Sequence, residues 1–582
     1  MISHNVNTLW GQAIVEELLH AGVKHACITP GGRSAPLSFA MLTNPEFTTY
    51  VHLDERSAGF FALGRAKRTG VPTPIVCTSG TAVANLHPSV IEADLSRTPM
   101  LLFTADRPSD LLHSGSNQTI SQDNIFSKSA RWNRTLPEPE LNERKFRSLR
   151  SAIARSLSEC NGMSPGPVHL NVPFRKPLEP NDTPDESVID FIANNPLAAE
   201  GRTGPYTKIT SGKSIISDED LLRISNLLSE SENGLIIAGP SNPNSISPDS
   251  LSLLSNSLGF PILADSLSGL RFGKHVESSH ICGGYDSYLN PITTKNWPNP
   301  DVIIRFGAAP ISLSLQNYLL RSGAYELLID PTGKARDPAF SSSELVSCDP
   351  TWFSNSISSR LSLDPHDLSN HFLSAESDYW ALIDSQNSFF EGSIASSLLD
   401  ISPANSTIIV SNSMPIRDID RFGKPASKQL TLIGNRGASG IDGVISTALG
   451  AASSTTDQVT LLIGDVAYYH DLSGLIALNK FNLKLIIIEI NNNGGGIFYR
   501  LPISKHDPPF TSGFRTPHDL DLSHSSNLYG FDFTRVSTIE DFNLEYESAL
   551  NQNKSCVIEV ISDPLENQST RENLQNTVIQ NI

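Results

Sequence analysis

The chain has 582 residues, which at roughly one domain per 150 residues corresponds to three or four domains. Lysine and arginine number 43 against 61 acidic residues, and the resulting net charge of −18 argues against nucleic acid as a partner. With 39% hydrophobic and 18% charged residues, the composition excludes an intrinsically disordered chain. The sequence is that of a large folded protein. Because its net charge is negative, any anionic ligand must bind to a local group of positively charged residues.

The cysteines and the first residues indicate the cellular compartment. Six cysteines lie far apart and form no C-x-x-C pair, so neither a zinc knuckle nor a disulfide framework is encoded. The start MISHNVNTLWGQ lacks a basic segment followed by an apolar one, and no run approaches the ~18 apolar residues of a membrane span. We therefore expect a soluble cytoplasmic protein without an integral membrane segment.

The first part of the chain alternates short apolar strands with amphipathic helices. The spacing predicts a helix over 9–19 and strands at 26–29, 50–53, 75–78 and 100–104. Strands separated by helix-length segments imply parallel β-α-β units. The following stretch, 180–217, is rich in Pro, Asn, Asp, Gly and Thr and shows no sustained period, which predicts a linker.

Two further α/β regions follow. Strands are predicted at 234–240, 260–265, 302–307 and 326–330, then, after a polar stretch at 341–374, at 408–411, 430–434, 459–465 and 484–490. No tandem repeat is visible. The fold class that these patterns predict is α/β, with three doubly wound parallel-sheet domains and ligands at the carboxyl ends of the strands.

Two motifs follow neighbouring strands of the third region. Gly464 and Asp465 end one strand, and Asn492 and Gly494 follow the next. The 26 residues between Asp465 and Asn492 accommodate one crossover helix, predicted at 471–480, and one parallel strand, so both side chains should emerge at the same sheet edge. Carboxylate, amide and carbonyl oxygens suit Mg²⁺, which also binds phosphates. Each motif alone is also an ordinary turn sequence.

Glu55 lies between a predicted strand and a helix predicted over 58–68, which places it at a strand-to-helix switch. A glutamate there can also be a charge that only complements the helix dipole. Residues 77–85 (CTSGTAVAN) form another strand, glycine turn and helix start. The combination with the downstream Asp465 and Asn492 motif makes a binding function for Glu55 the stronger interpretation.

Together these residues resemble the superfamily of thiamine-diphosphate-dependent enzymes. Its members have a pyrimidine-binding domain that supplies a glutamate, a central domain, and a diphosphate-binding domain with Gly-Asp and Asn-Asn spaced as here. The resemblance covers essentially the whole chain and implies these domains at 1–185, 205–360 and 385–582. The cofactors that it implies are thiamine diphosphate with Mg²⁺, or with Mn²⁺ in its place.

The resemblance also implies a role for each site residue. A carboxylate held against the pyrimidine nitrogen, here Glu55, shares a proton with it and promotes the imino tautomer that activates the cofactor. Ser439 is the implied carbonyl donor to the exocyclic amine and Ile441 the implied apolar wedge, although Ile441 also suits an ordinary core position. The implied metal ligands are Asp465, Asn492 and Gly494, and further cofactor contacts are Gly464, Ile497 and Phe498.

Six sequence blocks in chain order resemble a narrower family, the 2-succinyl-5-enolpyruvyl-6-hydroxy-3-cyclohexene-1-carboxylate synthases. The blocks are TPGGRSAPL (29–37), TADRP (104–108), GSNQTI (115–120), SNSMPIRD (411–418), NRGASGIDG (435–443) and NNNGGGIF (491–498). Members of this family are transferases that decarboxylate 2-oxoglutarate and add the succinyl carbanion in a 1,4 manner to isochorismate. The reaction belongs to the biosynthesis of menaquinone or phylloquinone.

Both substrates are dicarboxylates, so an acidic chain must offer guanidinium groups at the site. The substrate-binding candidates inside the blocks are Arg33, Arg107, Asn117, Gln118, Ser413, Arg417 and Arg436. One arginine alone is more often a surface ion pair, but four at predicted strand ends favour a binding role. Two features depart from the family: Gly32 stands where a serine is common, and 310–315 lacks the central-domain cation.

Two rival interpretations are open on sequence alone. Another carboligase of the superfamily, such as an acetohydroxyacid synthase, would need fewer cations because pyruvate is a monoacid. A catalytically silent binding subunit would have no chemical reason to retain Glu55, Asp465 and Asn492. The superfamily resemblance also implies an active centre completed across subunits, and therefore a homodimer or a homotetramer.

Overall fold

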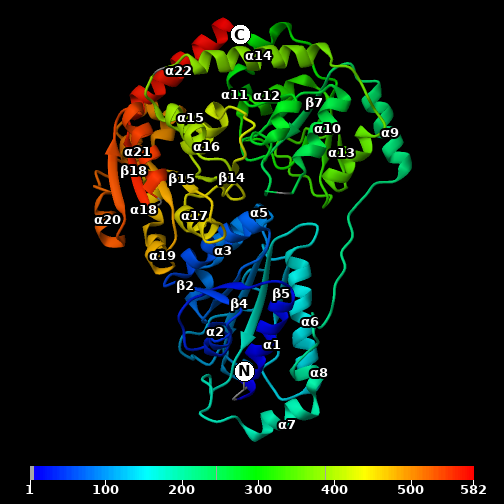
Figure 1. Ribbon diagram of the computed structural model, residues 1–582, viewed down its shortest axis with the longest axis vertical. Coiled ribbons are helices and arrows are strands. Elements are labelled where there is room, and N and C mark those ends of the chain that lie inside the picture. Colours follow the sequence, from blue (N-terminus) through cyan, green and yellow to red (C-terminus); the bar gives the residue numbers. More distant parts are fainter. Residues whose placement is uncertain (1–4, 244, 387, 553) are drawn as a thin grey trace. The chain divides into compact units, whose positions relative to one another are not determined.

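The computed structural model describes residues 5–243, 245–386, 388–552 and 554–582. Its strands form three six-stranded sheets in which every neighbouring pair is parallel (Figure 1). Helices connect the strands, as parallel pairing requires. The predicted α/β fold with three doubly wound parallel sheets is therefore confirmed.

The first sheet has the strand order β2-β1-β3-β4-β6-β5. Its strands are β1 (His25–Ile28), β2 (Thr48–Val51), β3 (Pro74–Cys77), β4 (Met100–Asp106), β5 (Trp132–Thr135) and β6 (Pro167–Pro173). The helices are α1 (Val6–His20), α2 (Ala35–Leu42), α3 (Glu55–Thr69), α4 (Thr81–Ala84), α5 (His87–Leu95) and α6 (Glu143–Cys160). β3 and β4 are buried along their whole length, which explains why each is a continuous apolar run in the sequence.

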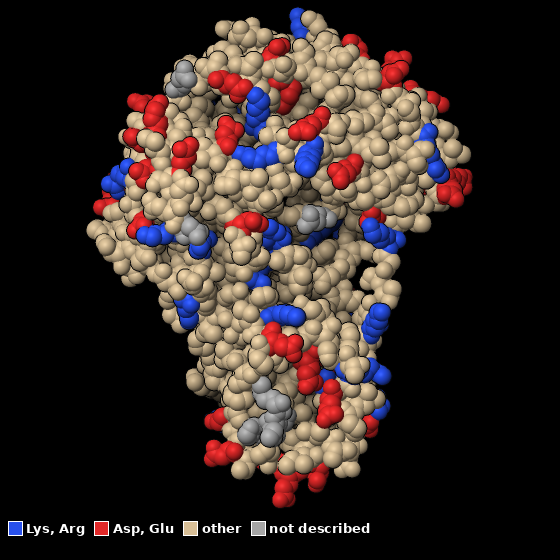
Figure 2. All heavy atoms as spheres, in the orientation of Figure 1, with Lys and Arg blue, Asp and Glu red and all other residues tan. Residues whose placement is uncertain are grey.

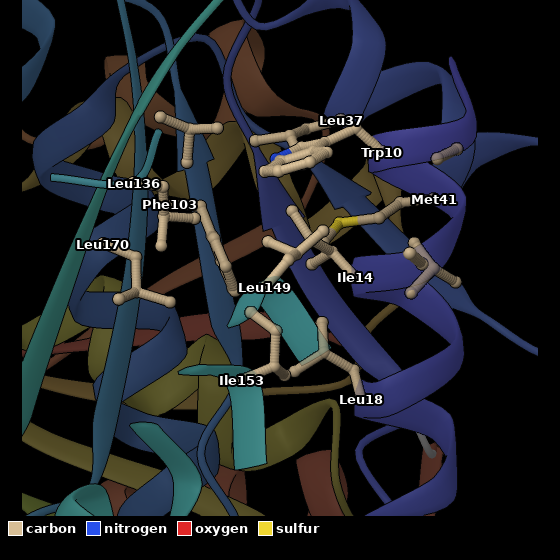
Figure 3. Packing of buried hydrophobic residues seen from close by; sticks show 14 of the residues in the cluster. Trp10, Ile14, Leu18, Leu37, Met41, Phe103, Leu136, Leu149, Ile153 and Leu170 are labelled. Atoms are coloured by element: carbon tan, nitrogen blue, oxygen red, sulfur yellow. The ribbon is translucent and has the colours of Figure 1, made fainter. Parts of the chain in front are cut away.

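The core of this region lies between the sheet and the helices α1 and α6. Asn5 starts α1 because its side-chain oxygen accepts a hydrogen bond from the Thr8 N–H at 3.0 Å. The helix then buries Trp10, whose ring centroid lies 4.9 Å from that of Phe146 of α6. Figure 3 shows Trp10 packed together with Leu149 of α6 and Phe103 of β4. The helical period predicted over 9–19 is thus the buried face of α1.

The prediction of a linker at 180–217 is wrong in part. The segment contains the helices α7 (Glu186–Asn194) and α8 (Pro196–Ala199). Val188 and Phe191 of α7 are buried, and the Phe191 ring lies 5.2 Å from the Phe146 ring. Arg150 donates a hydrogen bond to the Ala198 carbonyl at 2.9 Å. The short apolar period of α7 was obscured by the proline, asparagine and aspartate residues on either side.

The second sheet has the order β12-β11-β10-β7-β8-β9. Its strands are β7 (Gly234–Ala238), β8 (Ile262–Ala264), β9 (Ile281–Cys282), β10 (Val302–Phe306), β11 (Tyr325–Ile329) and β12 (Glu344–Val346). The helices are α9 (Asp218–Ser229), α10 (Pro248–Leu258), α11 (Tyr285–Tyr288), α12 (Leu313–Ser322), α13 (Pro350–Ser358) and α14 (Asp367–Asp384). The polar stretch at 341–374 is therefore structured, because β12, α13 and the start of α14 bury its few apolar side chains, among them Phe353 and Phe372.

The third sheet has the order β14-β13-β15-β16-β18-β17. Its strands are β13 (Thr407–Val410), β14 (Thr431–Gly434), β15 (Val459–Gly464), β16 (Ile486–Asn491), β17 (Asp532–Val536) and β18 (Cys556–Ile561). The helices are α15 (Glu391–Ile401), α16 (Met414–Phe422), α17 (Val444–Ala452), α18 (Asp465–His470), α19 (Ile476–Lys480), α20 (His524–Tyr529), α21 (Ile539–Gln552) and α22 (Pro564–Asn581). The crossover helix expected at 471–480 is in fact a 3-10 turn, η4 (Leu472–Leu475), followed by α19.

The described residues group into two compact units. The first comprises the residues up to Gly212 together with Arg436–Thr455 and Asp471–Leu483, and the second comprises Lys213–Asn435, Thr456–His470 and Lys484–Ile582. The first unit thus contains the first sheet and the connecting helices α17 and α19, while the strands of the second and third sheets belong to the second unit. The domain limits 1–185, 205–360 and 385–582 stay a prediction.

Charged residues are sparse on the surface. Figure 2 shows acidic and basic side chains dispersed over one face of the molecule, most of which is uncharged. In the part of the chain that the structure describes, no helix is both long and apolar enough to cross a membrane.

Candidate functional site

Glu55 is the first residue of α3, which begins shortly after β2. The turn forms because the preceding residue, Asp54, caps the helix: its Oδ1 atom accepts a hydrogen bond from the Arg56 N–H at 2.8 Å. Glu55 is half-buried. Burial, and then the charge of Glu55, raises the pKa of Cys77 at the end of β3. The Glu55 carboxylate therefore lies at the carboxyl edge of the first sheet, at the strand-to-helix switch that the sequence predicts.

The helix that carries Glu55 packs at backbone distance against α17, within the first unit. A Cβ atom at Gly64 of α3 would lie 1.9 Å from the Thr447 carbonyl oxygen, and one at Gly450 of α17 would lie 2.0 Å from the Phe61 carbonyl oxygen. Only glycine fits at either position. Next to this crossing, Arg65 donates a hydrogen bond to the Ser453 carbonyl at 2.7 Å. The two helices are thereby fixed to each other.

The loop before α17 carries two of the predicted cofactor residues and is held by a buried glutamate of α5. The Glu92 carboxylate accepts hydrogen bonds from the Gly437 N–H at 3.0 Å and the Ala438 N–H at 2.7 Å, and forms an ion pair with Lys67 at 2.9 Å. Ser439 is exposed and has a positive φ of 62°, and Ile441 is half-buried. Ile441 is therefore not an ordinary core residue, while its role toward a cofactor stays a prediction.

Two predicted substrate arginines come together at the end of the first sheet. Arg107 is buried and donates a hydrogen bond to the Ser79 hydroxyl, while Arg33 donates to the Phe174 carbonyl at 2.7 Å. Burial and then the charge of Arg107 lower the pKa of Arg33, so the two guanidinium groups lie close enough to interact. Gln118 donates to the Ser79 carbonyl at 3.1 Å.

Two further candidates of the first unit are Asn117 and Arg436. Asn117, the neighbour of Gln118, is exposed, and Arg436 is half-buried in the loop before α17. Arg33, Arg107 and Gln118 thus form one cationic corner at the strand ends of the first sheet.

Sequence reasoning missed the polar side chains that hold this corner. Gln122 accepts a hydrogen bond from the Gly80 N–H at 2.9 Å and donates to the Asn171 side chain at 2.9 Å, which in turn donates to Asp106 at 2.8 Å. Burial raises the pKa of Asp106 in spite of these contacts and of Arg107. The same residues border a cavity of about 680 Å³ in the first unit. No local sequence pattern marks them, because each contact joins separate strands and loops.

The predicted metal ligands lie together in the second unit, at the carboxyl ends of β15 and β16. Asp465 is 3% exposed, and its two oxygens accept hydrogen bonds from the N–H groups of Val466 and Gly494, each at 2.7 Å. Burial raises the pKa of Asp465, since it outweighs these hydrogen bonds. A bound cation would favour the charged form. The Nε2 atom of His518 lies 3.3 Å from the same carboxylate.

The arrangement around Asn492 fits a cation with oxygen ligands. Its amide nitrogen donates a hydrogen bond to the buried Glu391 carboxylate at 2.9 Å. Because a carboxylate only accepts, this contact fixes the amide orientation and leaves the Oδ1 atom free to face elsewhere. That Oδ1 atom is buried and has no hydrogen-bond partner among the described residues. An unpartnered amide oxygen near a buried carboxylate is the donor set that Mg²⁺ or Mn²⁺ prefers.

Three other predicted residues of the second unit border a cavity of about 720 Å³. Arg417, Ile497 and Phe498 all line it, together with the segment 311–314. Ser413, which has a φ of 72°, precedes α16, and its carbonyl accepts a hydrogen bond from Arg417 at 2.5 Å. The lining also includes three arginines that sequence reasoning missed, Arg421, Arg500 and Arg571. The segment 310–315 has no cationic side chain, as the sequence indicates. The cavity beside it is nevertheless lined by four arginines.

Comparisons with known proteins agree with this distribution of residues. Two family models match: "Thiamine pyrophosphate enzyme, N-terminal TPP binding domain" over residues 10–126 and "Thiamine pyrophosphate enzyme, C-terminal TPP binding domain" over 419–560. The first range contains Glu55, and the second contains Asp465 and Asn492.

Curated relatives are similar over their whole length. A protein of Haloarcula marismortui is 43% identical over 100% of both chains, one of Natronomonas pharaonis 44% over 100% of both, and one of Roseiflexus sp. 37% over 96% of both. All three are named 2-succinyl-5-enolpyruvyl-6-hydroxy-3-cyclohexene-1-carboxylate synthase.

Proposed function

Because this chain belongs to the family of 2-succinyl-5-enolpyruvyl-6-hydroxy-3-cyclohexene-1-carboxylate synthases, we propose that it joins 2-oxoglutarate to isochorismate with thiamine diphosphate as cofactor. The C1–C2 bond of 2-oxoglutarate breaks and releases CO2, and C2 then forms a bond to the ring of isochorismate by 1,4-addition. The observation that carries the proposal is the likeness to synthases over the full length of the chain.

Bound thiamine diphosphate supplies the nucleophilic carbon and the electron sink for the decarboxylation. Glu55 would share a proton through its carboxylate with the pyrimidine nitrogen. Its position at the start of α3, half-buried at a sheet edge, keeps it accessible to a ligand while the backbone contact between α3 and α17 holds its helix in place. Ser439 and Ile441, in the loop bonded to Glu92, would contact the cofactor by the backbone carbonyl and the aliphatic side chain.

Asp465 and Asn492 would hold the divalent cation that neutralises the diphosphate, with the Gly494 carbonyl as a further ligand. The support is the buried Asp465 carboxylate and the unpartnered Asn492 Oδ1 atom. Glu391 would act by keeping the Asn492 amide in this orientation. Gly464, Ile497 and Phe498 complete the proposed cofactor contacts.

Substrate carboxylates would bind to the proposed set of Arg33, Arg107, Asn117, Gln118, Ser413, Arg417 and Arg436. The support is electrostatic: Arg33 and Arg107 are close enough for the second to lower the pKa of the first, so an anion placed near both would relieve their repulsion. A guanidinium group also matches a carboxylate with two parallel hydrogen bonds.

The rival functions are less well supported. An acetohydroxyacid synthase would not need this number of arginines for pyruvate, and none of the three relatives described above carries that name. A catalytically silent subunit would have no use for a buried, unpartnered Asn492 oxygen. We further propose that the protein acts in the cytoplasm as a homodimer or a homotetramer, which light scattering at several protein concentrations would test.

The function is tested by incubating the purified protein with thiamine diphosphate, Mg²⁺, 2-oxoglutarate and isochorismate, with mass analysis of the products. The expected product contains the succinyl group on the ring acid and appears together with CO2. Reactions that lack one substrate serve as controls. Formation of acetolactate from pyruvate, with no product from the expected pair, would instead support the carboligase alternative.

A further inference from the structure

Arg500 occupies an unusual position in the cavity of about 720 Å³ in the second unit. It ends the 3-10 helix η5 (Gly496–Arg500), which follows the proposed metal ligand Asn492 and carries the proposed cofactor contacts Ile497 and Phe498. The facing walls of the cavity come from α11, α16 and α22, from the segment 311–314 and from the start of α12. Arg500 therefore reaches this space from the loop that carries the proposed cofactor residues.

Two other arginines of the cavity are engaged by partners of the protein itself. Arg571 forms ion pairs with Asp418 and, at 3.5 Å, with Glu391. Arg421 donates hydrogen bonds to the Ser287 hydroxyl at 2.7 Å and to the Gln575 side chain, and lies 3.9 Å from Asp286. Their charges are thus largely committed to holding the walls together.

Arg500 has no comparable partner. Within the described ranges its guanidinium makes one contact, a donation to the Met414 sulfur at 3.9 Å, and a thioether is a weak acceptor. No carboxylate pairs with it in those ranges. Partial burial, and then the charges of Arg421 and Arg571, lower the pKa of Arg500, while the charges of Asp286 and Asp418, which form no ion pair with it, act in the opposite direction. Arg500 therefore has hydrogen-bond donors available for an anionic ligand that enters the cavity.

Three acidic residues, Asp286, Asp420 and Glu572, also line the cavity, but Asp286 and Asp420 are paired with Arg421 and Arg271. The segment 311–314 offers no positive charge to an anionic ligand. In the segment 311–314 the cavity is bordered by Ile311, Ser312, Leu313 and Ser314, which offer hydroxyl groups and apolar surface. Ser312 already donates to Asp286 at 2.6 Å. The attraction for a negatively charged ligand must therefore come from the side of Arg500 and Arg417. The volume is in the range of about 300–1,000 Å³ that is usual for small-molecule sites.

We propose that Arg500 is an additional substrate-binding residue, which receives a carboxylate of one of the two dicarboxylate substrates in this cavity. The proposal rests on the function proposed above, because it takes the ligand to be 2-oxoglutarate or isochorismate. Arg500 supplies a planar pair of donors, and the neighbouring Arg417 supplies further positive charge. The cation missing from 310–315 is thereby provided from a different part of the chain.

The test compares steady-state kinetics of wild type, Arg500→Gln and Arg500→Lys, with each substrate varied in turn. Glutamine removes the charge and keeps a polar side chain, so KM for the substrate that Arg500 holds should rise about ten-fold or more, as for the loss of a charged hydrogen bond. Lysine should restore part of the loss. The exposed Arg360, which does not line the cavity, gives the matched control Arg360→Gln with unchanged kinetics.

A binding measurement separates substrate recognition from a general structural defect. Titration calorimetry with glutarate, which has both carboxylates but no reactive carbonyl, is carried out on the enzyme loaded with thiamine diphosphate and Mg²⁺. If Arg500 binds 2-oxoglutarate, Arg500→Gln weakens glutarate and leaves the Kd of thiamine diphosphate unchanged. If it binds isochorismate, glutarate binding is unchanged and KM for isochorismate alone rises.

An unchanged KM for both substrates in Arg500→Gln, in an enzyme whose wild type forms the expected product, would overturn the assignment of Arg500 alone. Failure of the wild type to form that product would instead overturn the proposed function. Weaker binding of thiamine diphosphate in Arg500→Gln, with both KM values unchanged, would also contradict the proposal, because it would place Arg500 with the cofactor.

Discussion

The first and third sheets share one strand order, and their corresponding strand ends carry different side chains. Counted from the first strand of each, both sheets run 2-1-3-4-6-5. The residues that follow strands one to four are Arg33, Glu55, Ser79 and Arg107 in the first sheet, and Ser413, Arg436, Asp465 and Asn492 in the third. The third sheet thus has a carboxylate and an amide, the proposed cation ligands, where the first has a hydroxyl and an arginine.

This difference shows that the fold provides positions and the side chains provide the chemistry. Parallel strands bring four loop starts to one sheet edge in both sheets. The acidic residue comes after strand two in the first sheet and after strand three in the third. The two helices that follow strand two, α3 and α17, are also equivalents, and they pack against each other.

The largest expected effect concerns the acid of the first sheet. Glu55→Gln should lower kcat by about 10² to 10⁴, because an amide cannot share a proton with the pyrimidine as a carboxylate does. Steady-state kinetics at saturating cofactor measures it, with the exposed Glu46→Gln as control. The Kd of thiamine diphosphate should hardly change. Equal activity of Glu55→Gln and wild type would remove Glu55 from the mechanism.

Replacing the acid of the third sheet should weaken cofactor binding, whereas replacing Glu55 should slow turnover. Asp465→Ala removes a proposed metal ligand, so the apparent Kd of thiamine diphosphate at fixed Mg²⁺ should rise roughly a hundred-fold. Calorimetric titration with the cofactor measures it, and Asp532→Ala, at an exposed position of β17, is the control. If Asp465→Ala bound the cofactor as wild type does, the segment from Gly464 to Gly494 would be only a turn, a crossover and a strand.

The equivalent helices α3 and α17 differ in how they are started, and this predicts a pH dependence. Asp54 precedes α3 directly, whereas the Ser446 N–H at the start of α17 is bound at 2.7 Å by Asp471, which is distant in sequence and fully buried. Burial raises the pKa of Asp471 to about 6. The folded protein therefore holds this proton more tightly than the unfolded chain does.

The stability that Asp471 contributes is complete below the unfolded pKa of about 4 and is lost as the pH rises to about 6. Over that interval the free energy of unfolding should fall by on the order of 3 kcal/mol from this group. Asp471→Asn, which keeps an acceptor for Ser446, should remove this part of the slope. Denaturant unfolding at several pH values measures it, and an identical slope in both proteins would show that Asp471 does not titrate there.

The smallest effect is expected for the arginine after strand four of the first sheet. Arg107→Ala should raise KM for one dicarboxylate about ten-fold, through the loss of a charged hydrogen bond. The Kd of thiamine diphosphate should stay unchanged, in contrast to the result for Asp465→Ala. Arg360→Ala is the control. Wild-type KM values for both substrates would exclude Arg107 from the substrate site.

Sequence patterns predicted the first four strands of the first and third sheets and the residues that follow them, and they predicted β7, β8, β10 and β11 of the second. They missed β5, β6, β9, β12, β17 and β18. Buried parallel strands are continuous apolar runs, so the amino-acid sequence places Glu55, Arg107 and Asp465 at strand ends. The residues that fix the loops and side chains of the proposed site in place could not be predicted in this way. Glu92 binds a loop more than 340 positions away, and Glu391 binds Asn492 across 101 positions. Such pairs leave no local periodicity. Arg500 lies beside a predicted motif, but its lack of a carboxylate partner within the described ranges is visible only in three dimensions.

The contact between α3 and α17 has a consequence for which mutations the protein can accept during evolution. At Gly64 and Gly450 even the methyl group of alanine would overlap backbone atoms of the opposite helix, and a backbone atom cannot move without its whole helix. A saturation mutagenesis screen should therefore find both positions intolerant of every substitution, although neither carries a functional group. Glycine would be retained at both positions because the two helices lie so close together. A larger residue at either position could be accepted only if the opposite helix shifted.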